Sequence, residues 1–394
     1  MSNRLQPEVW ALDRCSGCGA CVAACSKDLL YWGEEQHPLL EERQKALGLS
    51  RLKLRACEVC QRFCEEACPR LIEPAPREMR RATSARCTQG SRRGDPNSVI
   101  QALLVAARSA DLIDGAILLD LDPWSLAPFA RIVTTVDEIV STVGMQFLWA
   151  PVLSRLNEAI FTRGLRKLAI VGPPCAAAAA RRLMETRQER LRPYRQSIRL
   201  ALACFCTGMY LPNLVGDLLQ EGLGVASVQV RGLTAHPSEG LLRVTLWDGP
   251  PRDFPLTQVQ PFTRRGCGSC HDYLGESADL AVGAVGALRQ HATLITRTAA
   301  GEALLWNAIR MGLLQIVAYV DEEALRQASA AKDRRARAEA MAECHILMLE
   351  ALGDPKKRAE ARRQFVSLYG LQPQRTSRKE DGDGSCDACS GAGC

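Results

Sequence analysis

Hydrophobic residues recur with a helical period in one stretch of the chain, and short apolar runs follow it. In "SVIQALLVAARSADLI" (98–113) the apolar positions are spaced by three and four, which predicts a helix that begins near Pro96 and Ser98. The runs "DGAILLDL" (114–121) and "LRKLAIVGPPC" (165–175) predict buried strands, the second of which ends in a tight loop. This alternation of helix and strand is typical of an α/β domain.

Later segments predict other elements. "LALACFC" (200–206) predicts a strand with cysteines at its end, and the alternating patterns of "SVQVRG" (227–232) and "LLRVTLWDG" (241–249) predict antiparallel strands. Residues 320–365 are charged and predict helix. The polar, glycine-rich end, residues 372–394, predicts a disordered tail.

Composition narrows the protein class. The chain has 394 residues, 47% of them hydrophobic, and 18 cysteines. Its start resembles no signal peptide and no segment reaches the roughly 18 apolar residues of a membrane span, so we expect a cytoplasmic protein without a membrane span. In a reducing compartment, clustered cysteines indicate metal or redox chemistry rather than disulfides. The net charge of +6 is compatible with an anionic cofactor or acidic partner, and we expect no nucleic acid.

Eight cysteines lie near the start of the chain, in "CSGCGACVAAC" (15–25) and "CEVCQRFCEEACPR" (57–70). The spacing of two residues, with small residues between, lets a loop wrap around one iron–sulfur cubane. Paired CxxC motifs also occur in four-cysteine zinc sites, which is the alternative. Two such runs, with Pro69 after the last cysteine, favour iron.

These runs resemble those of bacterial-type ferredoxins, in which the fourth cysteine of a run binds the other cluster. The match is imperfect, because three residues separate Cys60 from Cys64 and Ser26 follows Cys25 where proline is usual. Carried over to this chain, the resemblance implies one [4Fe-4S] cluster on Cys15, Cys18, Cys21 and Cys68 and a second on Cys57, Cys60, Cys64 and Cys25.

Further cysteines follow in the α/β region, at Cys175, Cys204, Cys206, Cys267 and Cys270. The sequence "CGSCH" (267–271) also fits the CxxCH pattern of haem attachment, which we reject because that attachment normally follows export. For Cys87, Cys204 and Cys344 taken singly, the simplest interpretation is core packing.

Three motifs follow one another in the α/β region: "GPPCAAAAARR" (172–182), "ALACFCTG" (201–208) and "RGCGSCHDYLGESADLAVGAVGA" (265–287). Together and in that order, they resemble the beta-subunit family of coenzyme F420 hydrogenases and dehydrogenases. The resemblance extends over residues 83–320, and it implies a flavoprotein that binds FAD beside a third [4Fe-4S] cluster. It places that cluster on Cys175, Cys206, Cys267 and Cys270. Cys204 is the rival of Cys206, because the two are two residues apart and are expected on the same face of a strand.

The same resemblance suggests a flavin site. A glycine pair, Gly90 and Gly94, precedes the helix that begins near Ser98, and a helix amino terminus favours a pyrophosphate. Around Gly144 the family commonly has a lysine that "GMQFLW" (144–149) lacks, and alanines follow Cys175 where a polar residue is usual. The remaining family positions implied in the cofactor site are Asp272, Gly283 and Gly286.

We therefore expect an α+β/α/β fold: a ferredoxin-like two-cluster domain (1–75), a mixed α/β flavin and cluster domain (83–320), a helical extension (321–370) and a cysteine-containing tail (371–394). The arginine-rich segment 180–199 is explained either as a solvated helix face or as a site for an anionic ligand. The tail cysteines Cys386, Cys389 and Cys394 could cap a partner's cluster, bind metal or have no catalytic role, and the sequence does not decide between these.

Three functions fit these motifs. The first is an FAD and iron–sulfur oxidoreductase that exchanges hydride with coenzyme F420 or NAD(P)H and single electrons with ferredoxin or a partner redox subunit. The second is a ferredoxin-dependent reductase of another substrate, of the tetrapyrrole or sulfite type. The third is an electron-wiring subunit of a hydrogenase, formate dehydrogenase or disulfide reductase. No residue constellation indicates hydrolysis or acyl transfer, and the sequence does not identify the catalytic side chains.

Overall fold

The computed structural model describes residues 4–33, 36–40, 60, 62–90, 92–145, 147–222, 224–236 and 240–350, together with 354, 356, 357 and 360. Residues Met1–Ala338 form one compact unit, and Glu339–Cys394 form a second. The first unit contains every described cysteine discussed below. Cys57 and the tail cysteines Cys386, Cys389 and Cys394 lie outside the described residues.

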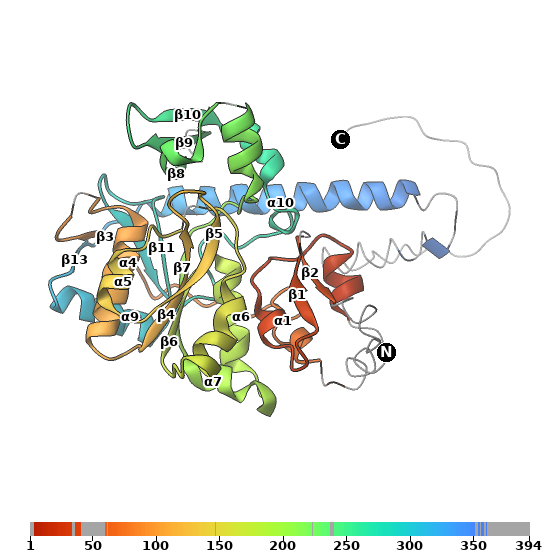
Figure 1. Cartoon of the computed structure of the whole chain (residues 1–394), viewed down its shortest axis with the longest axis horizontal. Helices are drawn as coiled ribbons and strands as arrows, with labels where there is room; N and C mark the ends of the chain where they lie inside the picture. Colours follow the sequence, from red (N-terminus) through yellow and green to blue (C-terminus); the bar gives the residue numbers. More distant parts are fainter. Residues whose placement is uncertain are drawn as a thin grey trace, which may run out of the picture. The chain divides into compact units, whose positions relative to one another are not determined.

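An eight-stranded sheet is the centre of the first unit (Figure 1). Its order is β13-β3-β12-β11-β7-β6-β4-β5, and β11, β7, β6 and β4 run parallel while the strands at both edges are antiparallel. The strands are β3 (Arg81–Cys87), β4 (Gly115–Leu121), β5 (Pro128–Val133), β6 (Leu168–Gly172), β7 (Ile198–Cys204), β11 (Leu280–Gly283), β12 (Ala292–Thr296) and β13 (Leu314–Val317). The strands predicted within 114–121, 165–175 and 200–206 are confirmed as β4, β6 and β7. Every residue of β4 and β6 is buried, as expected for strands covered on both faces.

Helices cover both faces of this sheet (Figure 1). On one face α4 (Pro96–Ser109) packs with α5 (Val136–Val140) and α9 (Ala299–Arg310), and on the other α6 (Pro174–Glu185) packs with α7 (Arg192–Ser197). The predicted start of the first helix is confirmed, because α4 begins at Pro96, and the Asp95 side chain accepts a hydrogen bond from the Asn97 amide at 2.9 Å. The tight loop predicted before Cys175 is short: α6 begins at Pro174, so Cys175 is its second residue.

A smaller antiparallel sheet, of order β10-β9-β8, has a separate apolar core. It consists of β8 (Val230–His236), β9 (Leu241–Leu246) and β10 (Arg252–Pro255), and the predicted antiparallel pair is confirmed by the register Leu233↔Val244. Short helices precede and follow its strands along the chain: η5 (Leu214–Gly222), η6 (Ser227–Gln229), α8 (Leu256–Val259), η7 (Gln260–Phe262) and η8 (Arg265–Cys267).

The amino-terminal part consists of η1 (Gln6–Trp10), α1 (Ala20–Ala23), β1 (Leu30–Trp32), β2 (Pro38–Leu40) and α3 (Phe63–Glu66). Cysteines make up much of its small core, since Cys21, Cys64 and Cys68 are buried together with Leu5 and Trp10. The remaining elements are η2 (Val152–Arg155), η3 (Glu158–Thr162), η4 (Glu189–Leu191) and the long α10 (Glu322–Glu350). Helix α10 confirms, for its own residues, the helix predicted within 320–365. None of the helices in the described part of the chain has the length and apolarity that a membrane crossing requires.

Candidate functional site

The two amino-terminal cysteine runs form related loops. In each, a residue with a left-handed backbone precedes a one-turn helix: Gly19 (φ 88°) before α1 and Arg62 (φ 53°) before α3. Cys21 and Cys64 are therefore the second residues of matching helices. The extra residue between Cys60 and Cys64 lies before this left-handed position, so the irregular spacing leaves the position of Cys64 on its helix unchanged.

The structure brings the cysteines assigned to the first cluster together. The thiol of Cys21 interacts electrostatically with those of Cys18, Cys15 and Cys68, and the thiol of Cys68 with those of Cys18 and Cys15. Burial raises the pKa of Cys21 well above its ordinary value and that of Cys68 to about 12. Thiols this buried stay protonated and inert unless a metal takes them as thiolates. The donor chemistry of this set therefore fits a metal cluster.

A third set of cysteines converges from separate elements of the α/β region. Cys175 comes from α6, Cys206 from the loop after β7, and Cys267 and Cys270 from η8 and the loop after it. The thiol of Cys175 interacts with those of Cys270, Cys206 and Cys267, and also with Cys18 of the amino-terminal set. The residues assigned to the third cluster thus lie together, next to the first set.

The end of β7 separates Cys204 from Cys206. The Phe205 amide donates to Val282 O at 2.9 Å, which completes the pairing of Cys204 with Val282 on β11. The next amide, of Cys206, donates instead to Tyr273 O at 3.1 Å, so the chain has left the strand there. The expectation that both cysteines share a strand face therefore fails at Cys206. Cys204 lines a cavity, whereas Cys206 interacts with Cys267 and Cys270.

The described residues contain no group of three or more His, Cys, Asp or Glu side chains that could hold a single metal ion.

Two cations lie against the third set. The Lys332 Nζ, on α10, donates to Cys206 O and Asp272 O at 2.6 Å each, and Arg70 Nη2 donates to Gly266 O at 2.9 Å. Burial opposes ionisation of Cys270, but Lys332 and Arg70 outweigh it and hold the pKa of that thiol below its ordinary value. The sequence analysis missed both cations.

A buried arginine joins the amino-terminal loop to the α/β region. Arg264 is 1% exposed, its Nη1 donates to Ser16 O at 2.7 Å, and its guanidinium lies 4.0 Å from the ring centroid of Trp149. Trp149 Nε1 in turn donates to Gly17 O at 2.9 Å. A Cβ on Gly17 (φ +70°) would lie 1.5 Å from Arg264 Nη1, so only glycine fits there.

The arginine-rich segment 180–199 also contacts the amino-terminal part. Arg182 Nη2 donates to Glu66 Oε1 at 2.9 Å, and Arg181 pairs with Glu185 at 2.7 Å while its Nη1 donates to Ala75 O. These two arginines are ion-paired within the protein. They hold the cysteine-rich segment against α6 rather than forming an open anion site.

A cavity of ≈ 900 Å³ lies where β4, β7 and β11 end and α4 begins, and residues of β8 and β9 line it as well. Its size suits a large organic cofactor, and ligands of α/β proteins commonly bind beyond the carboxyl ends of the parallel strands. Its walls include Arg92, Asp95, Pro96, Asn97, Leu121, Val140, Ser141, Thr142, Val143, Met145, Phe147, Cys204, Phe205, Val230, Arg231, Gly232, Leu233, Thr245, Trp247, Tyr273, Val282 and Gly283.

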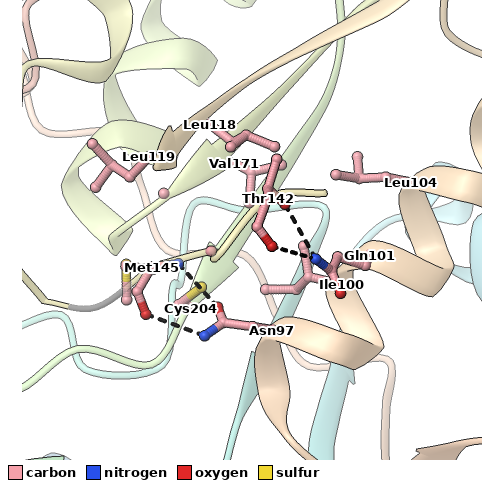
Figure 2. A pocket seen from close by; sticks show the side chains of 12 residues that line it. Asn97, Ile100, Gln101, Leu104, Leu118, Leu119, Thr142, Met145, Val171 and Cys204 are labelled. Carbon is pink, nitrogen blue, oxygen red and sulfur yellow. Dashed lines mark hydrogen bonds between the residues drawn. The ribbon is translucent and has the colours of Figure 1, made fainter. Parts of the chain in front are cut away.

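The loop around Gly144 is held to α4 beside this cavity (Figure 2). Asn97 accepts from the Met145 amide at 3.0 Å and donates to Met145 O at 3.2 Å, and Gln101 Nε2 donates to Thr142 O at 2.8 Å. Gly144 lies so close that a Cβ would be 2.7 Å from Asn97 Cγ. A rigid loop therefore forms this wall at the position where the family's lysine is missing.

The predicted flavin residues differ in their relation to this cavity. Gly283 lines it, and a Cβ there would lie 2.0 Å from the Phe205 ring. Gly144 lines a small cavity of ≈ 20 Å³ whose walls share Asn97 and Cys204 with the large one. The others are not among the lining residues of the large cavity: Gly90, Gly94, Ser98, Asp272 and Gly286.

Asp272 belongs to the third cysteine set instead. Its carboxylate accepts from the Gly275 amide at 2.7 Å and from the Glu276 amide at 3.1 Å, and it lines a second cavity, of ≈ 300 Å³, with Cys175 and Cys270. Sequence reasoning missed the large-cavity residues Phe205, Tyr273, Arg231 and Trp247. Only Phe205 and Tyr273 lie within the recognised motifs, and nothing in the 227–249 alternation marks a cavity wall.

Comparisons with known proteins agree with the motifs. Residues 165–322 match the family described as the C terminus of the beta subunit of coenzyme F420 hydrogenase/dehydrogenase, and residues 14–72 match a "4Fe-4S dicluster domain". A chain of the F420-reducing [NiFe] hydrogenase complex from Methanosarcina barkeri has the same fold, with a TM-score of 0.62, 21% identity, and coverage of 70% of this chain and 95% of that one.

Relatives extend over much of the sequence. An uncharacterized protein of Methanocaldococcus jannaschii is 29% identical over 85% of this chain and 98% of its own length. The coenzyme F420 hydrogenase subunit beta of Methanothermobacter thermautotrophicus is 25% identical over 55% of this chain and 76% of its own. The coenzyme F420-dependent sulfite reductase of M. jannaschii is 25% identical over 75% of this chain but 46% of its own. The resemblance recognised in the sequence is therefore confirmed: residues 165–322 are similar to the C terminus of coenzyme F420 hydrogenase/dehydrogenase beta subunits, and the 4Fe-4S dicluster match at residues 14–72 precedes them.

Proposed function

We propose that this protein exchanges hydride with coenzyme F420 at an FAD bound in the ≈ 900 Å³ cavity, and passes single electrons to a partner through three [4Fe-4S] clusters. NAD(P)H is the other candidate hydride donor, and ferredoxin or a partner redox subunit is the electron partner. A flavin supplies the chemistry of taking up two electrons at once and releasing them singly, while each cluster carries one electron at a time.

One observation carries this proposal: the end of β7 joins the cavity to the third cysteine set. Cys204 is in the cavity wall, and Cys206, two residues later, belongs to the set with Cys267 and Cys270. The third set in turn lies beside the first, since Cys175 Sγ is 3.9 Å from Ser16 O. This succession of the cavity, the third set and the first set supports a path for single electrons from the cavity towards the amino terminus.

The cavity walls fit a flavin nucleotide. The amino terminus of α4 forms part of the wall, and its helix dipole favours a pyrophosphate there. Arg92 and Arg231 add positive charge at the wall, and aromatic residues such as Phe205 supply an apolar surface for a ring system. Anionic and aromatic parts of one cofactor could thus be held by different walls.

The proposal is tested with anaerobically purified protein. We expect roughly twelve irons per chain, as three four-iron clusters require, and one FAD. Reduced F420, NADH and NADPH are then added separately while the flavin absorbance is followed. Bleaching by one of them supports the proposal, whereas FAD-free protein with full iron content would contradict it and favour the wiring-subunit function.

A matched pair of variants tests the cavity itself. Arg231→Glu places a negative charge in the cavity wall, so we expect FAD content to fall or the KM for F420 to rise roughly tenfold or more. Arg252→Glu makes the same change at an exposed residue of β10, in the same small sheet but outside the cavity wall. Equal behaviour of the two variants would remove the cavity from the proposed site.

The sulfite-type reductase is the second candidate, because a relative carries that name. It requires a substrate that the present chain reduces by itself. Steady turnover of sulfite by this chain with reduced F420 or ferredoxin would favour it, and the absence of turnover would leave the electron-transfer function.

A further inference from the structure

We propose that Lys332 raises the reduction potential of the cluster bound by Cys175, Cys206, Cys267 and Cys270, by holding a buried positive charge against it. This inference rests on the proposed function, because it requires that cluster. It gives the first part of α10 a role that neither the motifs nor the comparisons assign.

Lys332 is buried where an apolar residue is expected. Leu325, Ala328 and Ala336 are its neighbours on one stripe of α10, and Leu325 and Ala336 are 2% and 0% exposed while Lys332 is 5% exposed. Burying an ammonium group costs free energy unless its surroundings compensate. A lysine at this position therefore indicates a task that leucine or alanine could not perform.

Among the described residues, no carboxylate forms a direct ion pair with Lys332. Its two 2.6 Å hydrogen bonds go to the carbonyl oxygens of Cys206 and Asp272, which carry no net charge. Cys206 is one of the third-set cysteines, and Asp272 follows Cys270 by two residues. The ammonium therefore holds both cysteine-bearing loops, and it interacts electrostatically with the thiols of Cys270, Cys206 and Cys267.

A second cation acts on the third set. Arg70 interacts with Cys270, Cys175 and Cys267 from the amino-terminal side. At Cys270 the Asp272 carboxylate opposes Lys332 and Arg70, and the two cations outweigh it. The thiol of Cys270 therefore has a positive environment.

This environment favours the reduced cluster. Reduction adds one electron to the cluster and breaks no bond, so the reduced form is one charge more negative and gains more from a nearby cation. The third cluster, adjacent to the cavity, is thereby adapted to accept single electrons from the reduced flavin. Without Lys332 the third cluster would have a lower reduction potential.

The test compares Lys332→Met with Arg334→Met. Both remove one positive charge from α10, but Arg334 is exposed. Redox titrations followed by electron paramagnetic resonance monitor the signal that Cys267→Ser abolishes. In Lys332→Met we expect the ratio of reduced to oxidised third cluster to fall roughly tenfold at a fixed solution potential, which is about 59 mV for one electron. We expect the Arg334→Met titration to match wild type. Lys332→Arg keeps the positive charge, so we expect it to show the wild-type ratio of reduced to oxidised third cluster.

The outcomes separate the two proposals. An unchanged third-cluster potential in Lys332→Met overturns this inference and leaves the proposed function intact. If Cys267→Ser removes no signal of the wild-type protein, the third cluster is absent, and the proposed function itself is contradicted. If the Lys332→Met protein loses its iron, Arg70→Met is titrated instead. We expect this variant to lower the reduction potential of the third cluster, and an unchanged potential would contradict the inference.

Discussion

Replacement of Arg264 by methionine should release the amino-terminal cysteine loop from the α/β region. Methionine keeps much of the volume of the side chain but removes its charge and all five N–H donors. The buried carbonyl oxygen of Ser16 and the half-buried one of Gln36 then lose their guanidinium partner, and Trp149 loses its stacked cation. Because the amide of Arg264 still donates to Met209 O at 2.9 Å, the local backbone is expected to keep its course.

The size of the effect follows from these contacts. Each hydrogen bond from a charged donor to a carbonyl contributes about 1.5 kcal/mol or more, and a desolvated cation–π contact about 1 kcal/mol or more. Two such bonds and one such contact give about 4 kcal/mol, or about a thousandfold in the equilibrium between the docked and released loop. Arg265→Met is the matched control, because the neighbouring Arg265 is 68% exposed and pairs with Asp13 at 3.2 Å on the surface. Such exposed pairs contribute about 0–1 kcal/mol.

Hydrogen–deuterium exchange of residues 14–24 measures this release directly. We expect exchange in Arg264→Met to be faster by roughly two to three orders of magnitude, and exchange in Arg265→Met to stay within about fivefold of wild type. Retained iron would show that the clusters themselves survive. If the two variants exchange alike, the buried arginine does not hold the loop, and the contact between the cysteine sets has another origin.

Three further predictions follow from the same contacts. Gly17→Ala should lower the melting temperature and the iron content because its Cβ would collide with Arg264, whereas Gly164→Ala, which has open space around it and a similar positive φ of +71°, should keep its iron. Cys206→Ser should remove roughly four irons per chain and Cys204→Ser none, by iron analysis; equal losses would refute the separation at the end of β7. Oxidative removal of iron should raise amide exchange in 4–33 before the sheet unfolds, because cysteines form much of that core.

Much of the α/β scaffold was predictable because its signals are local. The stretch 98–113 has a helical period and a proline start, and the runs 114–121 and 165–175 are apolar strands, so burial and backbone preference agree. The cysteine spacings were equally informative, since they are dictated by the geometry of the group they would bind. These parts needed no knowledge of distant contacts.

The parts that escaped prediction depend on such contacts. Strand alternation could not separate Cys204 from Cys206, because β7 ends between them and the Cys206 amide donates to Tyr273 O. Arg231 reaches the cavity wall only because its small sheet packs there. Lys332 left a weak signal, as a cation on an otherwise apolar stripe of a charged helix, but its partners come from loops more than 50 residues away in sequence.

The central claim is that electrons leave a flavin in the cavity through the cluster at Cys175, Cys206, Cys267 and Cys270. Rapid freeze-quench electron paramagnetic resonance after mixing with the effective hydride donor tests it most directly, with Cys267→Ser compared against Cys87→Ser, a buried cysteine of β3 outside all three sets. The account predicts that flavin bleaching persists in both variants, that amino-terminal cluster signals develop in Cys87→Ser as in wild type, and that they are lost in Cys267→Ser. Amino-terminal clusters reduced at the wild-type rate in Cys267→Ser would contradict it.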